Sequence, residues 1–120
     1  MKPSSAKNKG RTLQKWVVER ILQLFPELSS RDVKSTSMGA NGEDVLLSSA
    51  AFQRVPFYVE AKSRAKIAIY GYYEQPKTSS DVLLIVKENR KKPLAILDAD
   101  LFFRLLKELN DYKESKSKQG

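Results

Sequence analysis

The chain has 120 residues, 41% hydrophobic and 30% charged, a composition that fits one soluble globular domain. It contains 22 Lys and Arg against 14 Asp and Glu, and the net charge of +8 favours a polyanionic partner, of which nucleic acid is the usual one. Cysteine and histidine are both absent, which excludes disulfides, thiolate metal sites, histidine-ligated zinc and nucleophiles activated by histidine.

The first third of the chain predicts a helix followed by a strand. Residues 1–9 are polar and basic without an apolar period, and we expect a flexible basic arm there. From Arg11 to Phe25 the apolar residues recur with helical spacing, and Pro26 ends that helix. Residues 31–36 are typical of a short strand, and the glycine-containing run 37–42 is typical of a turn.

The middle of the chain predicts two further strands and a second helix. Residues 43–48 form a strand with an apolar tail, residues 55–61 are rich in β-branched and aromatic side chains, and residues 48–54 are the expected hairpin connection. Residues 66–77 are ambiguous, because their two isoleucines alternate as in a strand. Their length and tyrosine spacing favour a helix.

The last third predicts two strands and a helix. Residues 81–87 and 93–98 are apolar strands around a basic turn, Leu101 to Leu109 form a final helix, and residues 112–120 are a polar tail. Residues 10–111 then make a single domain. The order helix, three strands, helix, two strands, helix predicts an α/β fold with a mixed five-stranded central sheet flanked by helices.

Two carboxylates and a lysine form the candidate catalytic site. Residues i and i+2 of a strand point to the same face, so Glu60 and Lys62 lie side by side while Ala61 points away. Taken alone, such a pair could also mark the point where a strand emerges into solvent, without any catalytic role. Asp44 opens the preceding apolar strand, and if the two strands are neighbours their opposing residues lie roughly 5 Å apart.

A divalent cation would reconcile these carboxylates. Two carboxylates this close repel each other unless one keeps a proton, and hard cations such as Mg²⁺ (or Mn²⁺) prefer carboxylate and carbonyl oxygens. We expect Asp44 and Glu60 to bind the metal, with the Ala61 carbonyl as a further ligand. Lys62 can then orient water or neutralise charge on a phosphate. The pattern indicates metal-dependent phosphodiester hydrolysis.

The first helix contains a polar residue in its apolar arc. Gln14 lies near the middle of the arc formed by Val17, Val18, Ile21, Leu22 and Phe25. It is either a structural amide with its own partners or a residue that reaches the metal site through water or a carboxylate. Glu19 projects away from the arc and is expected in solvent, and Trp16 with Leu13 is expected on the side opposite Gln14, as a dimer contact.

The ordered set of motifs resembles the PD-(D/E)XK nuclease superfamily. The resemblance rests on three segments: Lys9-Gly10-Arg11 followed by Gln14, the Gly39-Ala40 turn leading to Asp44-Val45, and Val59-Glu60-Ala61-Lys62-Ser63. The likeness is greatest to archaeal-type Holliday junction resolvases. Short nucleases encoded by phages are similar in the segments Tyr73–Gln75 and Asn89–Pro93, and the resemblance spans roughly residues 9–107.

The resemblance implies a restriction-endonuclease-like fold and a Holliday junction resolvase that cuts four-way DNA junctions as a homodimer. Asp44, Glu60 and Lys62 match the superfamily's catalytic residues, whereas Gln14 stands where the archaeal resolvases have glutamate. A less selective or repair- or restriction-type DNase with the same site is an alternative. A basic DNA-binding module without activity is another.

The positive charge lies in three segments that could converge on one face, and branched or double-stranded DNA is the expected partner. The residues expected to contact DNA are Lys9, Arg11, Ser37, Arg64, Lys66, Arg90 and Lys91. Tyr70, Tyr72 and Tyr73 could stack on unpaired bases, although at least two of them are expected to close the core. No run of 18 apolar residues predicts a membrane span, so we expect a cytoplasmic protein.

Overall fold

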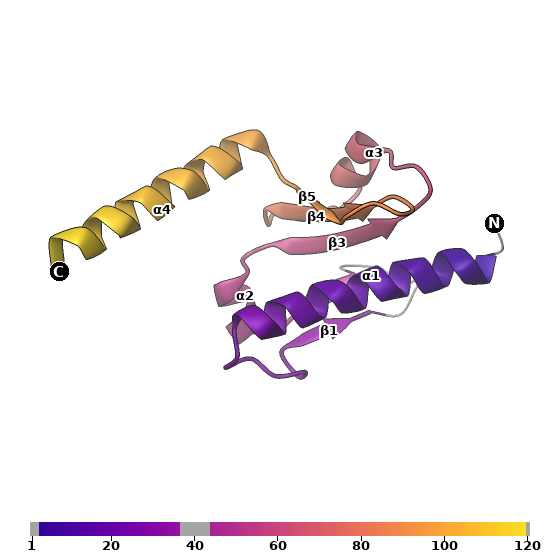
Figure 1. The fold of residues 1–120 in the computed structure, drawn as a ribbon, viewed down its shortest axis with the longest axis horizontal. Helices are drawn as coiled ribbons and strands as arrows, with labels where there is room; N and C mark the ends of the chain where they lie inside the picture. Colours follow the sequence, from indigo (N-terminus) through magenta and orange to yellow (C-terminus); the bar gives the residue numbers. More distant parts are fainter. Residues whose placement is uncertain (1–2, 37–43, 120) are drawn as a thin grey trace.

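Five strands form one mixed sheet with helices on both of its faces in the computed structural model, which describes residues 3–36 and 44–119 (Figure 1). In chain order the elements are α1 (Pro3–Leu24), β1 (Val33–Ser35), β2 (Val45–Leu47), α2 (Ser49–Arg54), β3 (Tyr58–Ser63), α3 (Ile69–Glu74), β4 (Val82–Lys87), β5 (Leu94–Ile96) and α4 (Ala99–Gln119). The predicted α/β class and the mixed five-stranded sheet are confirmed. None of the helices in these two ranges combines the length and hydropathy that a membrane crossing requires.

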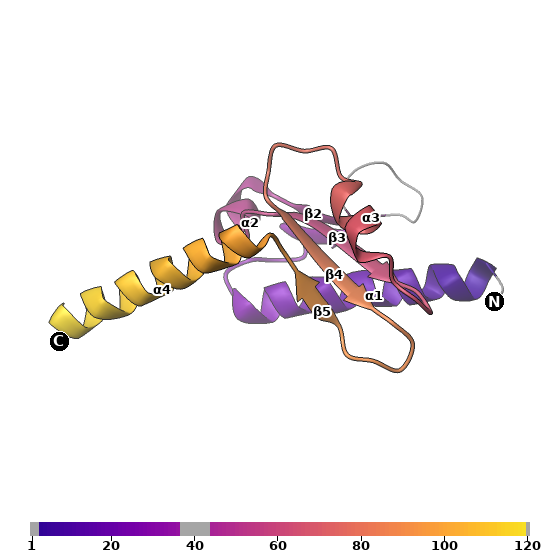
Figure 2. The same cartoon turned by 90° about the horizontal axis from the view of Figure 1, so that it is seen from above.

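The strand order in the sheet is the chain order, β1-β2-β3-β4-β5. Only β3 and β4 are parallel, and the crossover between them contains α3 (Figure 2). The other neighbours are antiparallel. The predicted pairing of the Asp44 strand with the Glu60 strand is confirmed, because Val45 of β2 lies opposite Val59 of β3.

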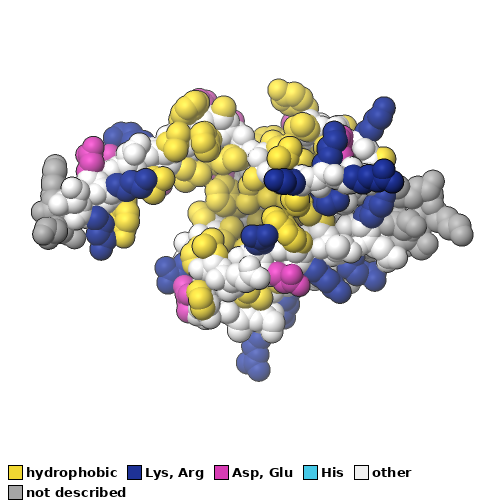
Figure 3. Space-filling view, viewed as in Figure 1, with side chains coloured by type: hydrophobic (Ala, Val, Ile, Leu, Met, Phe, Trp, Pro, Cys, Tyr) yellow, Lys and Arg dark blue, Asp and Glu magenta, His cyan; other side chains and the backbone are white. Residues whose placement is uncertain are grey.

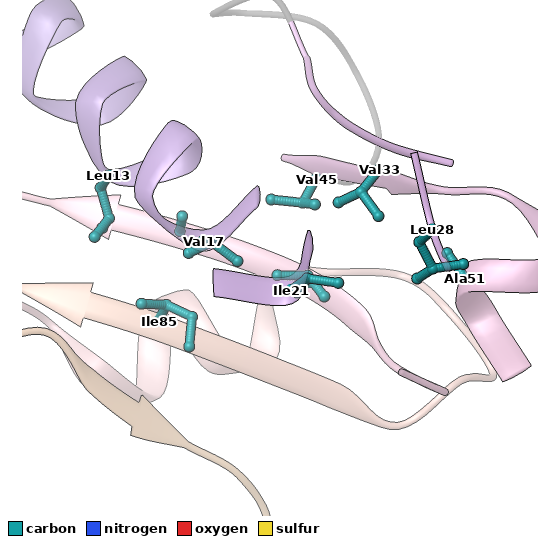
Figure 4. Close-up of a cluster of buried hydrophobic side chains, with 10 residues drawn as sticks. Leu13, Val17, Ile21, Leu28, Val33, Val45, Ala51 and Ile85 are labelled. Atoms are coloured by element: carbon teal, nitrogen blue, oxygen red, sulfur yellow. The ribbon is translucent and has the colours of Figure 1, made fainter. Parts of the chain in front are cut away.

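The hydrophobic core lies between α1 and one face of the sheet (Figure 4). It consists of Leu13, Val17, Ile21, Leu28, Val33, Val45, Ala51, Val59, Ala61 and Ile85. Because side chains alternate along a strand, Val59 and Ala61 point towards α1, and Glu60 and Lys62 point to the opposite face. Helix α3 lies on that opposite side of the sheet (Figure 1).

Both terminal helices are longer than expected. Helix α1 begins at Pro3, so residues 3–9 are helical and are not an arm without regular structure. Helix α4 continues to Gln119, so the polar segment from residue 112 is helical as well. Proline suits the first turn of a helix, and in α4 Lys107 and Asp111 form an ion pair of 3.2 Å at the i, i+4 spacing.

The connection between β2 and β3 also differs from the expectation. It is not a plain hairpin loop, because residues Ser49–Arg54 form the short helix α2. The observed order is therefore αββαβαββα, with one helix more than predicted. The ambiguous segment 66–77 does contain a helix, as favoured, but α3 covers only Ile69–Glu74.

Ser48 explains why α2 forms. Its hydroxyl accepts a hydrogen bond from the Ala51 N–H (3.1 Å), which caps the helix, and donates to Asp32 Oδ1 (2.8 Å) in front of β1. The pKa of Asp32 is lowered by the Ser29 backbone N–H and by the Ser48 hydroxyl. One side chain thus ties α2 to the edge of the sheet.

Replacing Ser48 with alanine is expected to destabilise the protein by about 1–2 kcal/mol, because it removes a helix cap and a carboxylate partner together. The measurement is urea unfolding of Ser48→Ala beside Ser49→Ala, whose exposed side chain lies in the first turn of α2. Equal stability of both variants and the wild type would contradict the assigned role.

Candidate active site

Asp44 is held against β3 by its own side chain. Its backbone N–H donates to the Val59 carbonyl (3.1 Å), and its Oδ2 accepts from the Ala61 N–H (2.9 Å). Strand β2 pairs with β3 at Val45 and Val59, and two residues further along β3 the Asp44 carboxylate takes the place of a backbone acceptor. This carboxylate is therefore fixed at the edge of β3, beside the residues predicted as catalytic.

Glu60 and Lys62 form a largely buried ion pair on the face of β3 away from α1. Glu60 is 6% exposed, and its Oε2 lies 3.7 Å from the Lys62 ammonium nitrogen. That nitrogen also lies 5.5 Å from the centroid of the Tyr72 ring in α3. The shared face that the i, i+2 spacing predicted is therefore present in the structure, and the ammonium group is held between a carboxylate and an aromatic ring.

The environment of Glu60 favours its neutral form. Burial and the charge of Asp44 together raise the pKa of Glu60 from 4.5 to about 7, although the positive charge of Lys62 acts in the opposite direction. This is the electrostatic conflict expected of two neighbouring carboxylates. Within the protein the lysine relieves it only in part.

The oxygen atoms at this edge fit a hard divalent cation. Asp44 and Glu60 contribute carboxylates, and the Ala61 carbonyl faces the same edge as the Ala61 N–H, since both backbone groups of one strand residue point to the same side. Within residues 3–36 and 44–119, no three or more acidic side chains lie together in a way that could hold a metal ion. A site with two carboxylates suits Mg²⁺, which keeps several waters, better than Ca²⁺, which takes 6–8 oxygen ligands.

Gln14 is oriented as predicted, and its role at a metal stays a prediction. The side chain is 2% exposed, on the side of α1 that packs against the sheet, and Glu19 is exposed as expected. The prediction of a dimer contact on α1 is wrong, because Leu13 is a core residue with 3% exposure. Trp16 is half-buried against that core and is covered by Arg20, whose guanidinium carbon lies 4.8 Å from the ring centroid.

The three basic segments converge at the end of the sheet where β3 and β4 terminate. The Lys9 ammonium of α1 donates to Asn89 Oδ1 (2.8 Å) in the β4–β5 loop, and the Arg64 N–H donates to the Lys87 carbonyl (3.1 Å). Further basic side chains are exposed around this end, namely Arg11, Lys66, Arg90, Lys91 and Lys92. Figure 3 shows several of the molecule's Lys and Arg side chains together on this side. Ser37 and the turn 37–42 lie outside the described residues.

Two residues that hold this region together were not predicted. Glu88 accepts a hydrogen bond from the Ile67 N–H (3.1 Å) and pairs with Lys91 (3.0 Å), so it links the segment after β3 to the β4–β5 loop. The role of Glu88 could have been predicted from the sequence, because it is a single acidic residue within a basic segment. The position of Tyr72 beside Lys62 could not, because that contact depends on how α3 crosses the sheet. Tyr70 is 81% exposed, and α3 contains no buried side chain, so the tyrosines do not close the core.

Comparisons of the chain with protein-family models, with curated proteins and with solved structures gave no match. The chemistry available at the site is that of its own residues: two carboxylates, an ammonium group and a backbone carbonyl at one edge of β3.

Glu60→Gln is expected to change how stability depends on pH. The folded pKa of Glu60 (about 7) lies above its usual value of 4.5, so its contribution to stability is present below pH 4.5 and is lost as the pH rises through 7. In a metal-free buffer the wild type should therefore lose stability relative to Glu60→Gln as the pH rises. The difference between their free energies of unfolding should change by about 3 kcal/mol in favour of Glu60→Gln between pH 4.5 and a pH above 7.

The measurement is chemical unfolding at several pH values with a chelator present. Glu19→Gln is the same substitution at an exposed position of α1. Its free energy of unfolding, plotted against pH, should run parallel to that of the wild type. A constant difference between Glu60→Gln and the wild type would show that burial does not hold a proton on Glu60. Added Mg²⁺ should narrow the gap above pH 7.

Proposed function

We propose that this chain is a metal-dependent nuclease with a restriction-endonuclease-like core. The observation that supports this most directly is the hydrogen bond between Asp44 and the Ala61 N–H, which fixes one carboxylate beside the buried pair of Glu60 and Lys62. A structural ion pair would account for Glu60 and Lys62 but does not require a second carboxylate, that of Asp44, fixed beside them. Hydrolysis of a phosphodiester uses all three groups.

Asp44 and Glu60, with the carbonyl of Ala61, are the residues that would hold Mg²⁺ or Mn²⁺. Bound there, the cation supplies Lewis acidity that stabilises charge on a phosphate oxygen and makes water a better nucleophile. The raised pKa of Glu60 supports this assignment, because a cation between the two carboxylates would favour their charged forms.

Lys62 places a fixed positive charge next to the reacting phosphate. Its side chain is only 19% exposed, so its charge is screened less than that of a surface lysine. Contacts with Glu60 and the Tyr72 ring hold the ammonium group in position, so little reorganisation is needed when negative charge develops on the phosphate. Lys62 thus acts as the electrostatic stabiliser of the transition state.

DNA is the proposed substrate. Arg64 and Lys66 follow Lys62 closely in the chain, and together with the basic side chains of α1 and of the β4–β5 loop they offer contacts for the phosphate backbone. The resemblance to junction resolvases supports branched DNA, in particular the four-way junction, as the preferred form. A homodimer would supply the two sites that symmetric cutting of a junction requires. Cleavage of four-way junction, linear duplex and single-stranded DNA with Mg²⁺ tests this preference.

Removing either side chain of the ion pair is expected to slow cleavage strongly and preserve DNA binding. Glu60→Ala loses a metal ligand, and Lys62→Ala should slow cleavage roughly 10²- to 10³-fold through loss of transition-state stabilisation. Single-turnover cleavage is measured beside equilibrium binding in a chelator. Glu19→Ala and Lys34→Ala, both at exposed positions, are the controls. Undiminished cleavage by both site variants would overturn the assignment.

The basic end of the sheet is expected to set the salt dependence of binding. The double substitution of Arg64 and Lys66 by serine should weaken binding of every DNA form, and the log–log salt slope should decrease by about 1 for each lost phosphate contact. Binding is measured from low to moderate salt. Substituting Arg31 and Lys34 by serine removes the same charge in and before β1 and should leave the slope unchanged. Identical slopes for both double variants would contradict the assigned DNA surface.

A further inference from the structure

Helix α4 lies largely outside the body of the protein. It is capped by Asp98, whose Oδ1 accepts from the Leu101 N–H (3.1 Å), and Leu101 is buried with 6% exposure at the base of the helix. From there α4 extends away from the sheet, and both views show no other element alongside its distal part (Figures 1 and 2). With 21 residues it is about 30 Å long.

The projecting part of α4 carries a row of apolar side chains in solvent. Phe102 is 47% exposed, Leu106 37%, Leu109 48% and Tyr112 60%. Together with Leu105 these positions repeat every three or four residues, which places them on one stripe of the helix, as in the seam of a coiled coil. Phe103, beside the stripe, is 64% exposed. Figure 3 shows hydrophobic side chains along this helix and in the angle between it and the body.

We propose that the stripe of Phe102, Leu105, Leu106, Leu109 and Tyr112 is the contact through which two copies of this chain dimerise, with their α4 helices antiparallel. A two-fold axis near the middle of the stripe brings Phe102 of one copy to Tyr112 of the other. The same axis brings Leu105 to Leu109. The stripe is therefore complementary to itself, as the interface of a symmetric dimer must be.

Charge favours a second copy of this chain as the occupant. The side chains of residues 99–117 include four basic and four acidic groups: Arg104, Lys107, Lys113 and Lys116, and Asp100, Glu108, Asp111 and Glu114. Residues 99–117 of α4 are thus electrically balanced in a protein of net charge +8, so two copies meet there without the repulsion that their basic ends would impose. Antiparallel pairing also places Asp98 of one copy near Lys116 of the other and opposes the helix dipoles.

The topology keeps this contact away from the candidate active site. Because β5 runs antiparallel to β4, the chain leaves β5 at the end of the sheet opposite to the C-terminal ends of β3 and β4. Dimerisation through α4 therefore leaves both basic ends accessible. The dimer contact does not depend on the nuclease activity, and either can fail without the other.

The first experiment measures the oligomeric state of purified full-length protein by light scattering during gel filtration. The wild type should have the mass of a dimer, and Leu109→Glu should weaken dimerisation roughly 30-fold or more and elute as a monomer. Ser115→Glu introduces the same residue at an exposed position outside the stripe, beyond its last member, and should remain dimeric. Since Leu109 is 48% exposed, Leu109→Glu should keep the wild-type circular dichroism spectrum and unfolding midpoint.

The second experiment tests the antiparallel register. The chain has no cysteine, so single cysteines can be introduced and joined with a short bifunctional maleimide. A mixture of Phe102→Cys and Tyr112→Cys copies should give a cross-linked heterodimer, and Phe102→Cys alone should give far less. A monomeric wild type, a dimer unaffected by Leu109→Glu, or preferential cross-linking of Phe102→Cys to itself would each overturn the proposal.

Discussion

The hydrogen bond from the Ala61 N–H to the Asp44 carboxylate is the constraint on which the candidate site depends. Ala61 is a buried residue of a central strand, and its N–H needs an acceptor at a point where the regular backbone pairing of β2 is not available. A side-chain oxygen satisfies it, which brings a carboxylate into the plane of the sheet. The Ala61 carbonyl then faces the same edge. Sheet pairing and the proposed metal ligation thus involve the same short stretch of β3.

That constraint has an electrostatic consequence. Fixing Asp44 beside β3 places it near Glu60. Because Glu60 is buried on the face of the sheet away from α1, water does not screen the repulsion between the two carboxylates. Lys62 offsets only part of it. An arrangement that raises the pKa of a carboxyl group to about 7 lowers stability at neutral pH, and such locally unfavourable arrangements are typical of functional sites. The same conflict is a reason for the proposed cation.

The sequence predicted those parts of the fold whose residues face the core. Period-two alternation identified the face shared by Glu60 and Lys62. Apolar runs, and a β-branched and aromatic run at residues 55–61, identified four of the strands, and the short strand within residues 31–36 was predicted as well. Residues 3–9 and 112–119 were missed as helices, because polar helices outside the core show no apolar period, and α2 is too short to show one. Leu13 was assigned to the surface because the buried face of α1 is wider than the narrow arc drawn around Gln14. The Lys62–Tyr72 contact depends on the crossover geometry of α3, which no local pattern encodes.

The direction of the last strand separates the two surfaces of this protein. Parallel β3 and β4 end together and gather the basic loops at one end of the sheet, whereas antiparallel β5 returns the chain to the other end before α4 begins. A dimer built through the basic end would bring like charges together and would cover the site. A dimer built through the balanced, apolar α4 does neither. A small domain with one core would thereby have room for both the proposed polyanion surface and the proposed dimer contact, because the direction of β5 places them at opposite ends of the sheet.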